Sequence, residues 1–322
     1  MKRNAIMLAL GACAACFAPG AQAQGFPAKP VTIVLPYPPG GAIDFLARAV
    51  GERLSTTLGQ QVLVESRPGA YERIASEFVL RQPADGYTVL MVAVPHATNP
   101  ALFPALPYDT LKEFAPLSHL VNIPPVLSVN PESGPKSFRE FVALARAKPG
   151  EATFGSAGNA TSTHLTVELL GTIAGVQFTH IPFKGDAPAI TEVLGGRVQA
   201  TSNTVPAVLA HIKGGRLRGI GIASRERLPA LPDVPTFVEQ GYPDAVITTW
   251  FGLVTRAGVP KEATARLNAD IHAALGTPAL RERLVAAGMT PVGGPPEQFG
   301  AHIRTEMDRW AQLVKARGIR ID

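Results

Sequence analysis

The chain has 322 residues, of which 46% are hydrophobic and 17% are charged. A chain of this length can bury a substantial core and corresponds to about two domains. Its 30 Lys and Arg residues against 25 Asp and Glu residues give a formal net charge of +5. The basic residues are scattered along the chain, so the composition argues against a nucleic-acid-binding protein and against one that coats a membrane surface.

The first 23 residues have the pattern of a cleaved secretory signal peptide. Lys2 and Arg3 form a positive start, residues 5–17 are apolar, and the segment ending at Ala23 matches an A-x-A cleavage site. The apolar run is too short for a transmembrane helix. We therefore expect cleavage after Ala23 and a periplasmic mature protein.

Both cysteines, Cys13 and Cys16, lie within this leader. Their C-x-x-C spacing matches a redox motif, but inside an apolar leader we interpret it as chance. An alternative is lipid attachment at Cys13, since residues 10–13 loosely resemble a lipobox, although the segment before it is short for that purpose. In the main interpretation the mature chain has no cysteine and its core alone holds it together.

The first stretch of the mature chain, residues 31–48, combines a strand, a turn and a helix. Residues 31–35 are an apolar run typical of a buried strand, and the prolines that follow end it. Gly40 and Gly41 permit a tight turn, and apolar residues at helical spacing predict a helix that ends at Gly59. Unpaired N–H groups at a helix N-terminus favour an anion. The turn is therefore either an anion site or a tight connection without a ligand.

Further strands and helices follow this stretch. Residues 61–65 predict a strand, residues 70–81 a helix, and residues 88–94 a strand that is apolar on both faces, as in a parallel sheet covered by helices. This order is one half of a doubly wound domain. Residues 95–100 are expected to form a loop at the carboxyl end of the third strand, where the loops of such folds converge on a ligand crevice.

A second set of elements begins after residues 118–129, which indicate a crossing between two lobes. A helix at 138–148 and a strand at 153–154 lead to a turn of small residues at 155–163 and a helix at 164–174. This repeats the layout of the opening stretch. Two turns that suit an anion therefore lie in different halves of the chain.

The remainder alternates strands and helices. Strands are predicted at 176–182, 198–202, 217–222 and 250–254, and helices at 187–194, 205–212, 263–275, 278–287 and 297–315. Residues 228–243 are proline-rich and irregular. The strand at 250–254 could return the chain to the first lobe.

Eight motifs in chain order carry a family resemblance. They are LPYPPGGAIDFLAR (35–48), VESRPGA (64–70), DGYTVL (85–90), GSAGNATSTHL (155–165), IPFKGDAPAI (181–190), HIKGGRLRGI (211–220), LPDVPTFVEQGYP (231–243) and WFGL (250–253). Each is weak by itself, but all eight occur in order. From about Phe26 to the C-terminus, the chain resembles the substrate-binding proteins of tripartite tricarboxylate transporters, the Bug family of periplasmic solute receptors.

The resemblance implies an α/β, two-lobed type II periplasmic binding-protein fold. Each lobe is a sheet flanked by helices, two crossing strands form the hinge, and the ligand lies in a cleft between the lobes. On this basis we divide the chain into the signal peptide (1–23), the N-terminal part of lobe 1 (24–122), lobe 2 (123–248), and a return to lobe 1 with the C-terminal helices (249–322).

The resemblance also implies that three segments hold a carboxylate of the ligand, in part through ordered waters. These are the first-lobe turn, the loop after the third strand and the glycine-serine turn of the second lobe. The residues at these positions are Pro39, Gly40, Gly41, Asp44, His96, Thr98, Asn99, Ser156, Ala157, Gly158, Asn159 and Thr161, with His164 close by.

Single residues of the expected site have alternative roles. Asp44 either caps the first turn of its helix or contacts an amine or hydroxyl of the ligand. His96 and His164 either bind a carboxylate or satisfy local backbone groups. Lys184 is either a fixed positive charge near the hinge or a solvated surface residue. Tyr37 is expected to line the cleft, where a ring with a polar tip suits an aromatic or short aliphatic acid.

Two departures from the family pattern concern ligand identity. After the RPGA motif the family typically continues with glycines, whereas this chain has Tyr71, Glu72 and Arg73, which could narrow the cleft or place a phenol and charges near it. Gln199 and Asn203 stand where acidic residues are common. If Asn203 lies near the cleft, the lost charge would weaken a preference for an ammonium group and leave an amide for a hydroxyl or carboxyl.

The residues do not favour an enzyme. Ser156 lies in G-S-A-G rather than G-x-S-x-G, and the sequence contains no H-E-x-x-H motif and no Walker lysine. We expect a monomeric periplasmic receptor, without cofactor or metal, that closes its hinge around a small carboxylated metabolite and delivers it to the membrane subunits of a tripartite transporter. The alternative is a ligand sensor that docks on a membrane signalling protein, and the sequence does not separate the two.

Overall fold

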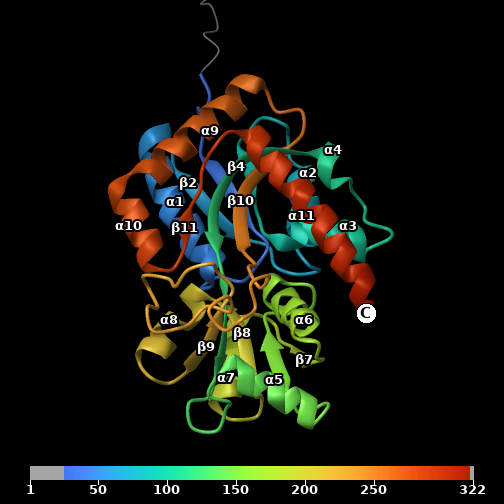
Figure 1. Ribbon diagram of the computed structural model, residues 1–322. Coiled ribbons are helices and arrows are strands. Elements are labelled where there is room, and N and C mark those ends of the chain that lie inside the picture. Colours follow the sequence, from blue (N-terminus) through green and yellow to red (C-terminus); the bar gives the residue numbers. More distant parts are fainter. Residues whose placement is uncertain (1–24, 320–322) are drawn as a thin grey trace, which may run out of the picture.

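The computed structural model describes residues 25–319, so the predicted signal peptide, its cleavage site and both cysteines lie outside the described residues. The chain is an α/β protein with two sheets. Figure 1 shows these sheets in two lobes, one above the other, each with helices packed on its sheet.

The first lobe contains a six-stranded sheet in the order β11-β4-β10-β3-β1-β2. Its strands are β1 (Val31–Leu35), β2 (Val62–Ser66), β3 (Thr88–Val92), β4 (Phe114–Ile123), β10 (Thr249–Arg256) and β11 (Thr290–Pro291). Its helices are α1 (Ala42–Leu58), α2 (Arg73–Leu80), α3 (Val94–Leu102), α4 (Thr110–Glu113), α9 (Lys261–Gly276), α10 (Pro278–Ala286) and α11 (Pro296–Arg317). β1 is parallel to β2 and β3, because a helix returns the chain between them, whereas β10 runs antiparallel to β3 and β4.

The second lobe contains a five-stranded sheet in the order β7-β6-β8-β5-β9. Its strands are β5 (Pro125–Val129), β6 (Thr153–Ser156), β7 (Thr179–Pro182), β8 (Ala200–Thr204) and β9 (Arg218–Ile222). Its helices are α5 (Phe138–Ala147), α6 (Ser162–Ala174), α7 (Asp186–Leu194) and α8 (Val205–Lys213). β6 is parallel to β7 and β8, and β5 is antiparallel to β8 and β9.

The chain passes between the sheets twice. β4 ends at Ile123 and β5 begins at Pro125, so Pro124 alone joins strands of different sheets. Such a crossing was predicted for residues 118–129. The chain leaves the second sheet after Ile222 and rejoins the first at Thr249. These two connections are the only covalent links between the sheets within the described residues. The end of β4 and the start of β10 therefore lie where a hinge between the lobes would bend.

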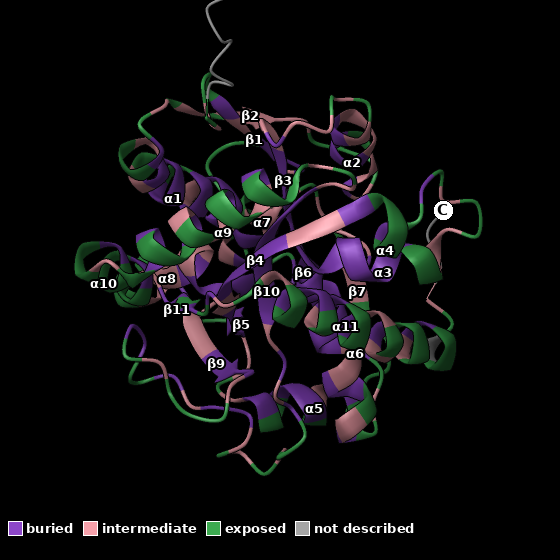
Figure 2. Cartoon of the chain, turned by 90° about the horizontal axis from the view of Figure 1, so that it is seen from above, coloured by how far each residue is buried: buried purple, intermediate pink, exposed green. Residues whose placement is uncertain are grey.

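Buried strands and C-terminal helix α11 hold the first lobe together. Strands β1, β3 and β10 are almost wholly buried, and Figure 2 shows them beneath helices whose outer faces are exposed. Trp250 of β10 is fully buried, and its indole N–H donates to Glu306 Oε2 at 3.1 Å. Trp310 donates to the same oxygen at 2.7 Å. A buried glutamate that accepts two indole N–H groups fastens α11 across the sheet, because an unpaired carboxylate would be costly there.

Two segments differ from the sequence-based expectation. Residues 95–100, expected as a loop, lie in α3, because Pro95 is in its first turn, where the missing N–H group costs nothing. The helix expected from residue 70 begins only at Arg73. Residues 70–72 instead have positive φ angles of 47°, 55° and 71°, so they form a left-handed turn that delays the helix. Short elements α4 and β11 were not predicted.

Gly252 offers a test of packing under α11. A Cβ atom at this position would overlap the ring of Phe299, and overpacking of this kind costs about 1–3 kcal/mol. We expect Gly252→Ala to lower the melting temperature by about 3–10 °C. Gly276→Ala is the matched control, because an added Cβ meets open space there. Equal melting temperatures for the two variants would contradict the packing described for β10.

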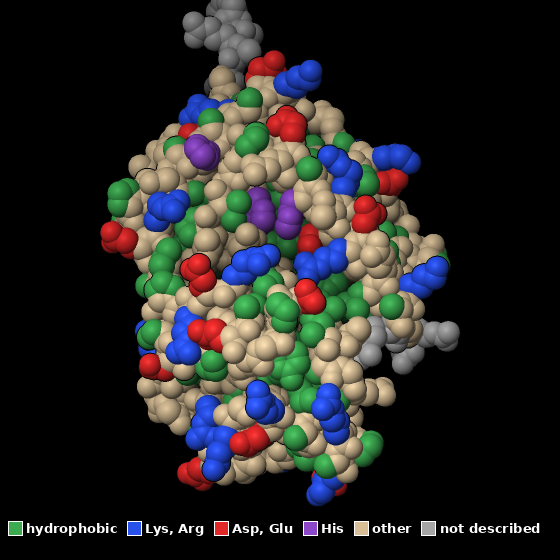
Figure 3. All heavy atoms as spheres, in the orientation of Figure 1, with side chains coloured by type: hydrophobic (Ala, Val, Ile, Leu, Met, Phe, Trp, Pro, Cys, Tyr) green, Lys and Arg blue, Asp and Glu red, His purple; other side chains and the backbone are tan. Residues whose placement is uncertain are grey.

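Charge on the visible face supports the composition argument. In Figure 3 the Lys and Arg side chains are interspersed with Asp and Glu, and no single-sign patch covers this face. Among the described residues, no helix combines the length and the apolar character that a membrane span requires.

Candidate functional site

A cleft of about 870 Å³ lies between the two lobes. Residues 37–43 line it from the first lobe, and residues 184–188, Thr204, Pro206 and Ala207 line it from the second. Thr249 and Phe251, next to the return connection, also contribute to its wall. Its volume is within the range of small-molecule sites.

Helix N-termini converge on this cleft. Residues at or next to the starts of five helices line it, namely α1 (Gly41 to Ile43), α3 (Ala93 and Pro95), α6 (Thr161 to Thr163), α7 (Gly185 to Pro188) and α8 (Thr204, Pro206 and Ala207). The N-terminus of a helix carries a partial positive charge and unpaired N–H groups. The wall is therefore suited to an anion contributed from solution.

The first-lobe turn leaves its N–H groups open. Gly41 is the N-cap of α1 and no side chain caps this end. The N–H groups of Ala42 and Ile43 have no hydrogen-bond partner among the described residues. Asp44 instead accepts from Gly40 N–H at 3.1 Å and pairs with Arg48 at 3.0 Å. The carboxylate thus stabilises the turn from behind, and the donors of the first helical turn remain free for a ligand.

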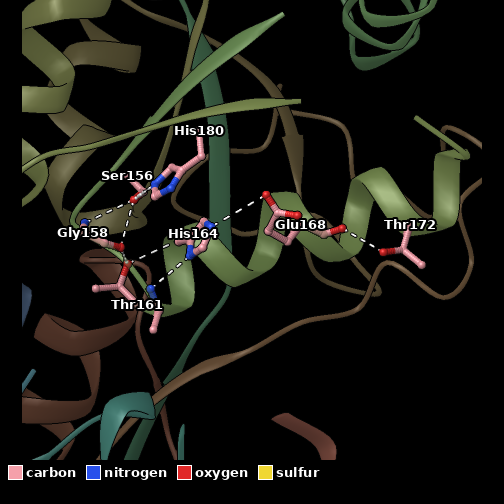
Figure 4. Close-up of polar contacts among 8 residues, drawn as sticks. Ser156, Gly158, Thr161, His164, Glu168, Thr172 and His180 are labelled. Atoms are coloured by element: carbon pink, nitrogen blue, oxygen red, sulfur yellow. Dashed lines mark hydrogen bonds and ion pairs between the residues drawn. The ribbon is translucent and has the colours of Figure 1, made fainter. Parts of the chain in front are cut away.

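The second-lobe turn is closed on itself to a greater extent than expected (Figure 4). Five N–H groups here are bonded locally: Ala157 to Thr163 Oγ1 at 3.2 Å, Gly158 to Ser156 Oγ at 3.2 Å, Ala160 to His164 Nδ1 at 3.0 Å, Thr161 to the Gly158 carbonyl at 3.4 Å, and His164 to Thr161 Oγ1 at 3.4 Å. Residues Ser162 and Thr163 at the start of α6 have no such partner for their N–H groups among the described residues. This turn therefore offers fewer donors than its composition predicts.

Two stacked histidines, His164 and His180, contact this turn. The His164 ring stacks on His180 at 3.8 Å, and His180 Nε2 lies 2.7 Å from Ser156 Oγ. Burial, with the neighbouring His164 ring, lowers the pKa of His180 to about 3. His180 is thus neutral at physiological pH and can exchange a hydrogen bond with the serine. The pair positions the turn and does not line the cleft.

The predicted site residues divide into two groups. Those that line the cleft are Tyr37, Pro39, Gly40, Gly41, Ala157, Thr161 and Lys184. Those that lie behind its wall are Asp44, His96, Thr98, Asn99, Ser156, Gly158, Asn159, His164 and Asn203. Both turns therefore meet at one cleft, but several of their polar side chains bond to the protein itself.

The residues of α3 face the interior because this segment is helical. His96 is 1% exposed, its ring packs 5.1 Å from Phe114, and burial lowers its pKa to about 3. Asn99 donates from Nδ2 to the Tyr71 carbonyl at 2.7 Å, which holds the left-handed turn before α2. A loop would have turned such side chains toward the cleft, whereas the helix buries them.

Asp186 is a cleft residue that the sequence argument missed. It lies in the first turn of α7 and lines the cleft. Its Oδ1 accepts from Asn203 Nδ2 at 2.8 Å, and burial raises its pKa to about 6. Asn203 was expected to leave this region without a carboxylate, but Asp186 supplies one beside it. The only signal in the sequence was an acidic residue that follows Lys184-Gly185 at a helix start.

Glu72 was noted as a departure, and the structure places it beneath the cleft wall. It is 2% exposed, and its Oε1 accepts from Ala93 N–H, at the start of α3, at 3.1 Å. Its Oε2 has no hydrogen-bond partner in the described part of the chain. Burial raises the pKa of Glu72 to about 8, although the Ala93 N–H group and the Tyr37 phenol each act to lower it. The phenol expected from Tyr71 is not at the cleft, because Tyr71 packs on Phe103. The phenol that lines the cleft is that of Tyr37, and Glu72 lies behind it.

Comparisons with known proteins identify the family. The model of the tripartite tricarboxylate transporter family receptor matches residues 46–319. The chain belongs to this family. Its members are substrate-binding receptors, so this receptor is not an enzyme. Protein BugT of Bordetella pertussis is 36% identical to it over 301 residues, which are 93% of this chain and 92% of BugT.

Solved structures confirm the two-lobed fold of the receptor. One from R. palustris, with adipate, is 33% identical, covers 92% of this chain and 99% of its own, and has a TM-score of 0.87. MatC from Rhodopseudomonas palustris, with bound malate, is 30% identical, covers 90% and 100% of the two chains, and has a TM-score of 0.82. Among the described residues, no cluster of His, Cys, Asp and Glu could hold a metal ion.

Proposed function

We propose that this receptor captures a small carboxylated metabolite in the cleft and delivers it to the membrane subunits of a tripartite transporter. The observation that carries the proposal is the convergence of five helix N-termini on one cleft, with open N–H groups at the start of α1. Similar receptors hold adipate and malate, both of which are carboxylates.

Hinge closure would complete the site. The cleft is shared between the lobes, so a ligand bound to α1 can also contact the starts of α6 and α7 when the lobes approach. Closure removes water from these hydrogen bonds and strengthens them. The measured affinity then includes the free energy needed to populate the closed state.

The proposal places the receptor in the periplasm as a cysteine-free monomer. Residues 1–23 supply the export signal, and cleavage after Ala23 removes Cys13 and Cys16. Membership in a family of periplasmic receptors supports this location. The family also supports a membrane transporter as the partner.

A panel of mono-, di- and tricarboxylates tests the binding step. The mature protein, unfolded and refolded to remove any copurified ligand, is titrated by calorimetry and by thermal shift. A true ligand at a hundred times its dissociation constant should stabilise the protein by about 2.7 kcal/mol and raise its melting temperature by several degrees. The absence of any response across the panel would refute carboxylate capture.

Delivery is tested in cells. A strain without this receptor should lose uptake of the ligand that the panel identifies, and plasmid-borne receptor should restore it. Unchanged uptake, with a lost transcriptional response to the ligand, would favour a sensor that docks on a membrane signalling protein.

A further inference from the structure

Asp186 presents unused acceptor capacity to the cleft. Its Oδ1 accepts from Asn203 at 2.8 Å, and its Oδ2 accepts weakly from Thr204 Oγ1 at 3.4 Å. A carboxylate has about four lone-pair positions. Because Asp186 lines the cleft, its remaining positions are available to a ligand.

No cation of the described protein pairs with Asp186. Its nearest neighbours in the hydrogen-bond network are the neutral side chains of Asn203 and Thr204, and no Lys, Arg or His forms an ion pair with it within the described chain. Lys184 lies on the same wall but is exposed and forms no ion pair there. A partly desolvated carboxylate without a counter-charge is unfavourable. A cationic group of the ligand would offset that cost.

A second carboxyl group lies in the same region of the wall. Tyr37 lines the cleft. Burial raises the pKa of its phenol well above the ordinary value, and the nearby carboxyl groups of Glu72 and Asp186 raise it further. The phenol is thus close to both carboxyl groups. Glu72 is 2% exposed and its Oε2 has no partner among the described residues. Glu72 is buried behind Tyr37 and keeps its proton near neutral pH, so Asp186 is the ionised carboxylate that faces the cleft, whereas the start of α1 supplies donors.

We propose that the cleft selects a carboxylate that also carries a protonated amine, with the amine on Asp186 and the carboxylate at the N-terminus of α1. This inference rests on the proposed function and narrows its ligand class. The Asp186–Asn203 hydrogen bond gives it a structural basis, because the neutral Asn203 amide holds the Asp186 carboxylate in place without neutralising its charge. Asp186 is thus a specificity-determining residue.

Matched pairs of acids with and without the amine provide the test. Calorimetry at pH 7.5 on the ligand-free mature protein compares aspartate with succinate, glutamate with glutarate, and 4-aminobutyrate with butyrate. At least one amine-bearing acid should bind about tenfold or more tightly than its partner, as expected for a hydrogen bond to a charged group. This comparison needs no variant, so it does not depend on how any substitution folds.

Asp186→Asn then tests the residue itself. The substitution removes the charge with little change in shape, and it should weaken binding of the amine-bearing acid about 10- to 100-fold while changing the matched acid less than about threefold. Glu192→Gln is the control, because Glu192 lies on the same helix but is paired with Arg197 outside the cleft.

The outcomes separate this inference from the proposed function. If acids without an amine bind as tightly as their partners, or if Asp186→Asn leaves the discrimination unchanged, the inference is wrong and carboxylate capture stands. If no acid of either kind binds, carboxylate capture itself is wrong, and the inference falls with it.

Discussion

Replacing Gly41 with aspartate should abolish carboxylate binding without destabilising the fold. Gly41 is the N-cap of α1, with φ −88° and ψ −179°, a conformation that any residue can adopt. An added Cβ meets open space there. The new carboxylate would accept from the open N–H groups of the first helical turn and would occupy the position of the ligand's carboxylate.

Two opposite readouts make this prediction specific. Affinity for the acid identified by the panel should fall by at least about a hundredfold, since like charges at a binding site cost several kcal/mol. The melting temperature of the ligand-free protein should stay the same or rise slightly, because Asp and Gly differ at an N-cap by a few tenths of a kcal/mol. Calorimetry and thermal melting measure the two quantities.

Gly41→Ala separates charge from bulk. It adds the same Cβ atom without a carboxylate, so we expect it to retain binding within about tenfold of the unmodified receptor. If Gly41→Asp binds the acid as tightly as Gly41→Ala does, the N-terminus of α1 is not where the carboxylate sits.

Between pH 6.5 and pH 8, Glu72 should lower the stability of the receptor relative to a variant in which this side chain cannot titrate. Burial raises the pKa of Glu72 from 4.5 to about 8, so the folded protein keeps a proton that the unfolded chain has already lost. Raising the pH therefore favours the unfolded state until the folded carboxyl also ionises. At about 1.36 kcal/mol per pH unit, the loss across this window is about 2 kcal/mol.

The buried histidines stay neutral in the folded protein throughout this window, and their titration near pH 6.5 in the unfolded chain is the same in a Glu72 variant, so it cancels in a comparison of the two proteins. Burial lowers the pKa of His96 and His180 to about 3 and that of His119 to about 4. Their stabilising effect is present above pH 6.5 and is lost as the pH falls toward these values. Asp186, with a pKa of about 6, changes mainly below the window.

Glu72→Gln is the matched variant. Its amide oxygen can still accept from Ala93 N–H, but the side chain does not titrate, so the pH dependence between 6.5 and 8 should flatten. Denaturant unfolding of the ligand-free protein at several pH values measures the effect. If the stability of the two proteins depends on pH in the same way, Glu72 is already ionised in the folded state.

The sequence by itself determined the elements that depend on local patterns. Apolar runs and helical spacing predicted β1, α1 and the C-terminal helices, because burial of one face imposes these periods on the residues. Gly59 predicted the end of α1, and it adopts a positive φ angle that other residues disfavour. Ordered motifs along the chain also predicted the family and therefore the two-lobed fold.

Only the tertiary structure decided which polar groups face the cleft. The two turns are similar in composition, but the first N–H groups of α1 are open, whereas those of Ala157 and Ala160 are bonded within the turn. The difference depends on Thr163 and His164, whose side chains reach back from α6. The pairing of Asp186 with Asn203 joins the first residue of α7 to a residue of β8, which no local pattern encodes. Hydrogen-bond partners far apart in the chain are set by packing, and so the acceptors and donors left for a ligand appear only once the chain is folded.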